Sequence, residues 1–76
     1  MEFRWNNWNT AHIAEHGVTV EEAEYIVRNA QLPYPRVAAN DKRQVVGQTD
    51  SGEFLQVFFI YSPPGVILCD SRPPAE

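Results

Sequence analysis

Residues 12–23, His-Ile-Ala-Glu-His-Gly-Val-Thr-Val-Glu-Glu-Ala, carry the end of one predicted helix and the start of another. Gly17 lies where a left-handed residue ends many helices, and glycine adopts that conformation without a Cβ clash. Thr19 and Glu22 have the spacing of a capping box, in which each side chain accepts a hydrogen bond from the other residue's amide. The stretch therefore predicts two helices joined by a short turn.

The same stretch contains His12-x-x-Glu15-His16, a spacing found in zinc peptidases. The two histidines lie four residues apart and so share one helix face. A zinc site needs at least one more ligand, and with only two histidines in the chain a carboxylate such as Asp70 would have to supply it. Gly17 also places His16 at a helix end. We therefore interpret the stretch as the end of one helix and the capped start of the next, and we expect no metal ion and no cofactor.

Length and composition indicate one small domain spanning residues 1–76. The chain is 43% hydrophobic and has two Trp, three Tyr and four Phe, which supports a packed core. It has no apolar run of about 18 residues and no N-terminal signal peptide pattern. The single cysteine, Cys69, excludes an internal disulfide framework and a cysteine zinc site. We expect a cytoplasmic protein.

The net charge of −4 argues against strong nonspecific binding to nucleic acid, because affinity for phosphates requires clustered cations. Three of the six cationic residues, Arg36, Lys42 and Arg43, nevertheless lie within eight positions of one another. A small basic site on an acidic protein is therefore compatible with the sequence.

The pattern of apolar residues predicts an α+β fold with the order β-α-α-β-β-β-β. The second helix has the stronger signal, an apolar stripe from Val20 to Ala30 that ends before Pro33 and Pro35. Asn6 or Asn7 offers an N-cap to the first helix. The predicted strands are residues 2–5, 36–39, 44–48, 54–61 and 66–70, and the predicted helices begin near residues 8 and 20.

Short loops between consecutive strands predict an antiparallel meander of three to four strands, with the helical pair covering one face. Residues 54–61 are nearly all apolar, which is typical of a central strand covered on both faces. Residues 72–76 resemble the entry to a further helix, since proline is tolerated in a first turn.

Several motifs together resemble the BrnT family of bacterial type II toxins, and they cover nearly the whole chain. The matching positions are the opening Phe3-x-Trp5-Asn6, residues 16–23, Gly47, the apolar run 55–60 and the closing Ser71-Arg72. The corresponding family positions carry Phe-x-Trp-Asp, a His-Gly-Val-Ser-Phe-Glu-Glu-Ala signature after a lysine, a glycine, an apolar strand and Ile-Ser-Ala-Arg.

The resemblance implies a fold similar to that of RelE ribonucleases, metal-independent endoribonuclease activity on RNA, and inhibition by a tightly bound BrnA-like antitoxin. The basic helix that follows the last strand in the family is absent from these residues, so the expected fold lacks a C-terminal helix. Arg43 and Arg72 match the family arginines before the second sheet strand and after the last one.

RNA cleavage without a metal needs a proton acceptor, a proton donor and cations that face the phosphorane. A guanidinium binds two phosphate oxygens at once, and an imidazole exchanges protons near neutral pH. We therefore predict that Arg43, Arg72 and His16 are catalytic and that the two arginines approach each other across a sheet face. The structural alternatives are solvated strand-end arginines and a histidine that bonds the last helix carbonyls.

The acidic charge and the absent basic helix leave a second hypothesis open. In it, the chain is a non-catalytic protein-interaction module that retains the BrnT-like fold. This module would form a stable complex, or a homodimer through the sheet or its edge. The two hypotheses differ in one measurable respect, because only the first predicts RNA degradation in the presence of a chelator.

Overall fold

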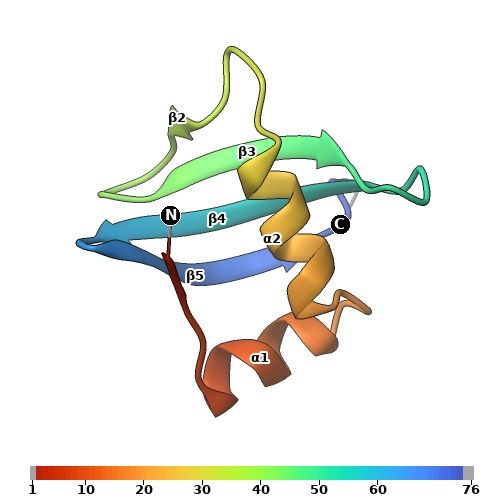
Figure 1. Ribbon diagram of the computed structural model, residues 1–76, viewed down its shortest axis with the longest axis horizontal. Coiled ribbons are helices and arrows are strands. Elements are labelled where there is room, and N and C mark those ends of the chain that lie inside the picture. The colour runs from red at the N-terminus through yellow and green to blue at the C-terminus, as the bar shows by residue number, and fades with distance from the viewer. Residues whose placement is uncertain (1, 75–76) are drawn as a thin grey trace.

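The computed structural model describes residues 2–74 of the chain, and within that range two helices accompany one five-stranded sheet (Figure 1). In chain order the elements are β1 (Glu2–Arg4), α1 (Asn7–Ala14), α2 (Val20–Arg28), β2 (Arg36–Val37), β3 (Arg43–Gln48), β4 (Phe54–Ser62) and β5 (Gly65–Arg72). This order confirms the predicted α+β layout.

The sheet has the strand order β1-β5-β4-β3-β2. Strands β2 to β5 form the predicted antiparallel meander, and β1 adds a parallel neighbour to β5. Because β1 pairs only with Gly65–Ile67, the second half of β5 is left for α1, which packs along that edge (Figure 1).

Helix α1 begins at a capping box, of which only the N-cap, at Asn6 or Asn7, was predicted from the sequence. Asn6 is the N-cap, and its backbone amide and that of Asn9 each donate to the other residue's side-chain oxygen at 2.9 Å. The Asn9 amide group also donates to the Arg4 carbonyl at 3.2 Å, and the residue is 1% exposed. A buried asparagine thus ties the start of α1 to the end of β1.

The turn between the helices has the glycine and the capping box that the sequence predicts. Gly17 has φ +74°, and the amides of Gly17 and Val18 donate to the carbonyls of Ala14 and Ile13, the paired bonds of a Schellman motif. The predicted Thr19–Glu22 capping box is present, with bonds of 3.0 and 3.1 Å. Helix α1 ends at Ala14, before the predicted residue 16.

Helix α2 lies across one face of the sheet and buries its apolar stripe there (Figure 1). Ile26 packs against β3 at Gly47, where an added Cβ would lie at an ordinary contact distance of 3.4 Å from the Ile26 side chain. The core consists of the buried residues Ile13, Val18, Ala23, Ile26, Val27, Val45, Leu55, Val57, Phe59, Val66 and Leu68.

The opposite face of the sheet is open. Along β4, Leu55, Val57 and Phe59 are buried whereas the intervening Gln56 and Phe58 are only half-buried. The expectation that residues 54–61 are covered on both faces is therefore wrong, because α2 covers one face and α1 lies at the sheet edge. In the described part of the chain, no helix covers the open face.

A β-bulge interrupts the pairing of β4 with β5. Phe58 pairs with Asp70 and Phe59 pairs with Leu68, so Cys69 is one extra residue on β5. Before the bulge Leu68 faces the core, and after it Ser71 does, with exposures of 1% and 0%. The extra residue shifts the alternation of β5 by one position.

The predicted helix entry at residues 72–76 lies partly outside the described range, and Arg72 itself ends β5. Among residues 2–74, neither helix has the length and apolar character needed to cross a membrane.

Candidate functional site

Two histidines, one aspartate and one arginine meet at the junction of α1 with β5. The Nε2 atom of His12 lies 3.3 Å from Asp70 Oδ1, and the Nε2 atom of His16 lies 4.0 Å from the same oxygen. On the other side of the carboxylate, Arg72 Nε lies 3.4 Å from Oδ2. We call these four residues the His–Asp–Arg cluster.

The first helix and its C-terminal turn position the two imidazoles. His12 is in the last turn of α1, while the His16 amide donates to the Ile13 carbonyl at 3.0 Å within the turn that follows. Ile13 is 1% exposed and anchors this segment in the core. The His12 ring stacks on Trp8, with ring centroids 5.1 Å apart and planes 6° apart. Packing and backbone bonds therefore hold both imidazoles near β5.

The bulge at Cys69 positions the other half of the cluster. Because the extra residue shifts the alternation of β5, Asp70 and Arg72 both lie on the side away from the core while Ser71 stays buried between them. Asp70 then reaches the histidines at the strand edge, and the Arg72 guanidinium lies over the Phe58 ring at 5.9 Å.

Next to the cluster, the open face of the sheet holds a shallow hollow of about 180 Å³, whose lining is Ala38, Ala39, Lys42, Phe58, Asp70 and Arg72. Two of these residues are cationic and one is aromatic. A third cation, Arg36, lies on the same face, since its Nε donates to Gln44 at 3.0 Å and Gln44 donates to Gln56 at 3.2 Å. This face combines positive charge with an aromatic ring beside two imidazoles.

The structure does not bring Arg43 to this cluster. Arg43 pairs with the buried Phe59, whereas Arg72 pairs with Gln56, three residues away along β4. Directly paired residues share a face and positions three apart face opposite ways, so the two arginines lie on opposite faces. The Arg43 guanidinium lies over the Tyr61 ring at 5.4 Å. The predicted approach of Arg43 to Arg72 across one face is thus wrong.

Of the predicted catalytic residues, His16 and Arg72 meet through Asp70. His12, Lys42 and Phe58 were not predicted as catalytic residues, and Asp70 was considered only as a carboxylate that could complete a zinc site. The i, i+4 spacing of the histidines was one available signal. The proximity of Asp70 was not readable, because it depends on which strand packs against α1 and on the bulge.

Cys69 is adjacent to the cluster but is poorly suited to its chemistry. Burial raises the pKa of its thiol; the Asp70 charge adds to this effect and the Lys42 charge opposes it. A neutral thiol is a weak nucleophile and a weak metal ligand. The reactive groups of this region are therefore the imidazoles, the carboxylate and the guanidinium.

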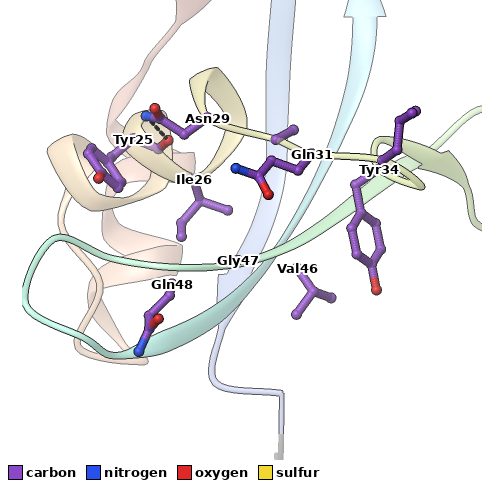
Figure 2. A pocket seen from close by; sticks show the side chains of 10 residues that line it. Tyr25, Ile26, Asn29, Gln31, Tyr34, Val46, Gly47 and Gln48 are labelled. Carbon is purple, nitrogen blue, oxygen red and sulfur yellow. Dashed lines mark hydrogen bonds between the residues drawn. The ribbon is translucent and has the colours of Figure 1, made fainter.

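A larger hollow, of about 460 Å³, lies between α2, the segment that follows it and β3 (Figure 2). Figure 2 shows Ile26 pointing from α2 towards Gly47, with Tyr34 and Val46 at the other end. None of the four cluster residues lines it. This larger hollow and the cluster are therefore separate features.

The cluster offers two kinds of chemistry. Two imidazoles beside a guanidinium can transfer protons at a bound phosphate. Alternatively, one nitrogen of each histidine and one oxygen of Asp70, all within 4.8 Å of one another, can hold a metal ion. No protein-family model matches the chain, and no curated protein or solved structure matches it either. The choice between these kinds of chemistry therefore depends on the geometry and on the sequence motifs.

Proposed function

We propose that the chain is a metal-independent endoribonuclease and acts as the toxin of a type II toxin–antitoxin pair. One observation carries the proposal: Asp70 gathers the imidazoles of His12 and His16 and the guanidinium of Arg72 into one cluster beside the open sheet face. The motifs that resemble the BrnT family supply the substrate class and the biological setting.

In the proposed reaction, a ribose 2′-oxygen attacks the adjacent phosphorus and the bond from phosphorus to the 5′-oxygen breaks. One imidazole of the cluster accepts the 2′-OH proton, and the other donates a proton to the leaving 5′-oxygen. The products are a 2′,3′-cyclic phosphate and a 5′-OH end. Asp70 orients both rings, a role that carboxylates often play beside catalytic histidines.

The cations of the open face suit the phosphate. Arg72 borders both the carboxylate and the hollow, so its guanidinium can contact the oxygens on which charge develops. Lys42 lines the same hollow, and Phe58, also in its lining, offers a ring for base stacking. RNA would therefore lie across the open face, with its reacting phosphate at the edge where α1 meets β5.

Cleavage of a fluorescent RNA in EDTA tests the proposal. We expect wild-type protein to cut the RNA with the chelator present, and His16→Ala to lose about 100-fold or more, the usual contribution of a general acid or base. Arg72→Ala should lose a similar amount, since it removes a donor that faces the phosphate. Arg43→Ala is the matched control and should retain nearly full activity, because its guanidinium lies on the opposite face.

Three outcomes would reject the assignment. Intact RNA with wild-type protein in EDTA would reject the ribonuclease. Equal activity of wild type and both loss variants would indicate a contaminating nuclease. A larger loss in Arg43→Ala than in Arg72→Ala would move the site to the other face. Circular dichroism spectra of all variants control for folding.

A non-catalytic interaction module is the second candidate, and exposed apolar residues at one edge of the molecule favour it. Leu32 is 95% exposed and Val37, on the two-residue edge strand β2, is 63% exposed. We propose that this edge binds the cognate antitoxin or a second copy of the chain. Light scattering of the purified chain, alone and co-expressed with the product of a neighbouring small gene, measures both: a monomer in each case would contradict this surface.

A further inference from the structure

The His–Asp–Arg cluster contains a set of atoms with the composition of a transition-metal site. His12, His16 and Asp70 each offer one ligand atom, and these atoms lie within 4.8 Å of one another. Two imidazole nitrogens and one carboxylate oxygen suit Zn²⁺ and similar ions, whereas Mg²⁺ and Ca²⁺ prefer oxygen ligands. Asp70 on β5 therefore supplies the third ligand that the two histidines need.

The distances fit a small ion after modest adjustment. Ligand atoms bound to a tetrahedral zinc at about 2.0–2.1 Å lie about 3.3 Å from one another. The His12 Nε2 to Asp70 Oδ1 separation is 3.3 Å, which already matches. The His16 Nε2 to Asp70 Oδ1 separation is 4.0 Å and the three ligand atoms lie within 4.8 Å of one another, so the His16 side chain has to move towards the other two ligands.

Neighbouring side chains restrict the orientation of two of these ligands, Asp70 and His12. Arg72 contacts Asp70 Oδ2, while Oδ1 faces the histidines and also accepts a hydrogen bond from the Ser71 amide at 2.9 Å, so both oxygens of the carboxylate are held in place. Trp8 stacks flat on His12 and restricts rotation of that ring. Such outer contacts orient the ligands in many metal sites.

The three side chains are also reachable from solvent. The exposed fractions of the His12, His16 and Asp70 side chains are 34%, 23% and 19%. An ion can therefore enter without unfolding, and three protein ligands leave a further coordination position for water, as in catalytic and inhibitory zinc sites.

From this geometry we propose that His12, His16 and Asp70 bind one Zn²⁺-class ion. The proposal for binding is independent of the ribonuclease. Its regulatory consequence rests on the proposed function: the ion uses the imidazoles that would otherwise transfer protons, so bound Zn²⁺ inhibits RNA cleavage. This accounts for a cluster that serves metal-independent chemistry and still has the composition of a metal site.

Equilibrium dialysis of chelator-treated full-length chain against ZnCl₂, with MgCl₂ in parallel, tests the binding. We expect one Zn²⁺ per chain and no Mg²⁺. His12→Ala, His16→Ala and the nearly isosteric Asp70→Asn should each weaken zinc binding by at least about 10-fold, the lower end of the effect of disturbing a metal site. Cys69→Ser and Glu15→Gln are matched controls that remove a neighbouring thiol and a neighbouring carboxylate, and both should bind zinc as wild type does.

Several results would overturn the site. These are absence of zinc binding, unchanged binding in all three ligand variants, or loss of binding in Cys69→Ser alone. Co²⁺ gives a second readout, because a tetrahedral nitrogen and oxygen site produces a visible absorption band that the Asp70→Asn protein should lack.

The two proposals can fail separately. Zinc binding without any RNA cleavage in EDTA would reject the ribonuclease and leave the metal site standing. RNA cleavage that persists with one Zn²⁺ bound per chain would reject inhibition. Cleavage in EDTA with no zinc binding at all would reject the metal site and leave the ribonuclease.

Discussion

At position 70, the two oxygens of a single carboxylate face different partners. Oδ1 faces the two imidazoles and Oδ2 faces the Arg72 guanidinium. Removal of that carboxylate would separate the proton-transfer groups from the phosphate-binding group even though each would remain in place. Asp70 therefore links the two halves of the proposed site, although its own role is to position other residues.

The neighbouring Cys69 gives a prediction with a defined sign. Burial raises the pKa of its thiol, so the folded chain keeps the neutral form to higher pH than an unfolded cysteine does. Iodoacetamide reacts with the thiolate. We expect the alkylation rate of the folded chain to reach its half-maximum at a higher pH than that of the chain in guanidinium chloride, as measured by mass spectrometry. A midpoint at or below that of the unfolded chain would contradict the role of burial.

At the scale of the elements, the predictable features were those set by local sequence. Gly17 fixed the end of the first helix, and Thr19 with Glu22 fixed the start of the second, because these bonds form between residues at most a few positions apart. The order of the strands also followed from short loops and turn residues. The parallel pairing of β1 with β5 was not predicted, because nothing local to residues 2–4 specifies a partner sixty residues away.

The composition of the site was less predictable for the same reason. Whether Arg43 and Arg72 share a face depends on the register with which β3 and β5 pair with β4. A shift of one residue in that register moves each side chain of the strand to the other face of the sheet. The bulge at Cys69 is such a shift, and no turn residue or composition change marks it in the sequence. The i, i+4 histidines were visible, but their carboxylate partner was not.

Gly65 supports a prediction about the edge of the sheet. A Cβ at this position would collide with the backbone carbonyl of Glu2, the residue that pairs with it across β1 and β5. Gly65→Ala should therefore cost about 1–3 kcal/mol of the free energy of unfolding, as overpacking does. Urea denaturation measures this loss.

Gly47→Ala is the matched control for that experiment. A Cβ at position 47 meets only the Ile26 side chain, at an ordinary contact distance of 3.4 Å. A loss in Gly47→Ala as large as that in Gly65→Ala would show that the effect is general to strand glycines and does not come from the pairing of β1 with β5.

At the scale of the whole molecule, the net charge conceals an uneven distribution. Glu21, Glu22 and Glu24 lie on α2, whereas Arg36, Lys42 and Arg72 lie on the open face of the sheet. An acidic protein can therefore carry a basic surface, and the net charge of −4 does not describe the local charge on the open face.

The salt dependence of RNA binding tests this surface. Each phosphate contact to single-stranded nucleic acid contributes about −0.7 to the slope of log K against log salt, so three cations predict a slope of about −2. The measurement uses the cleavage-impaired His16→Ala protein and fluorescence anisotropy. Lys42→Ala on that background should reduce the slope by about 0.7, as for loss of one phosphate contact.

Arg28→Gln is the control for charge alone. Its guanidinium lies over Phe3 at 4.8 Å and beside Glu24, away from the open face. The slope should therefore stay unchanged in this variant. An equal reduction in both variants would indicate a response to net charge and not to a located surface.

The bulge makes the cluster depend on how β5 pairs with β4 as much as on the identity of its residues. A regular β5 that kept Cys69 would pair Asp70 with Val57 and Arg72 with Leu55 on the core face, whereas a deletion of Cys69 would keep the present pairs of Asp70 with Phe58 and Arg72 with Gln56. In evolutionary terms, loss of the codon for Cys69 would remove the bulge and keep both side chains on the open face. Strands with and without the extra residue can therefore present the same aspartate and arginine to the same face of the sheet.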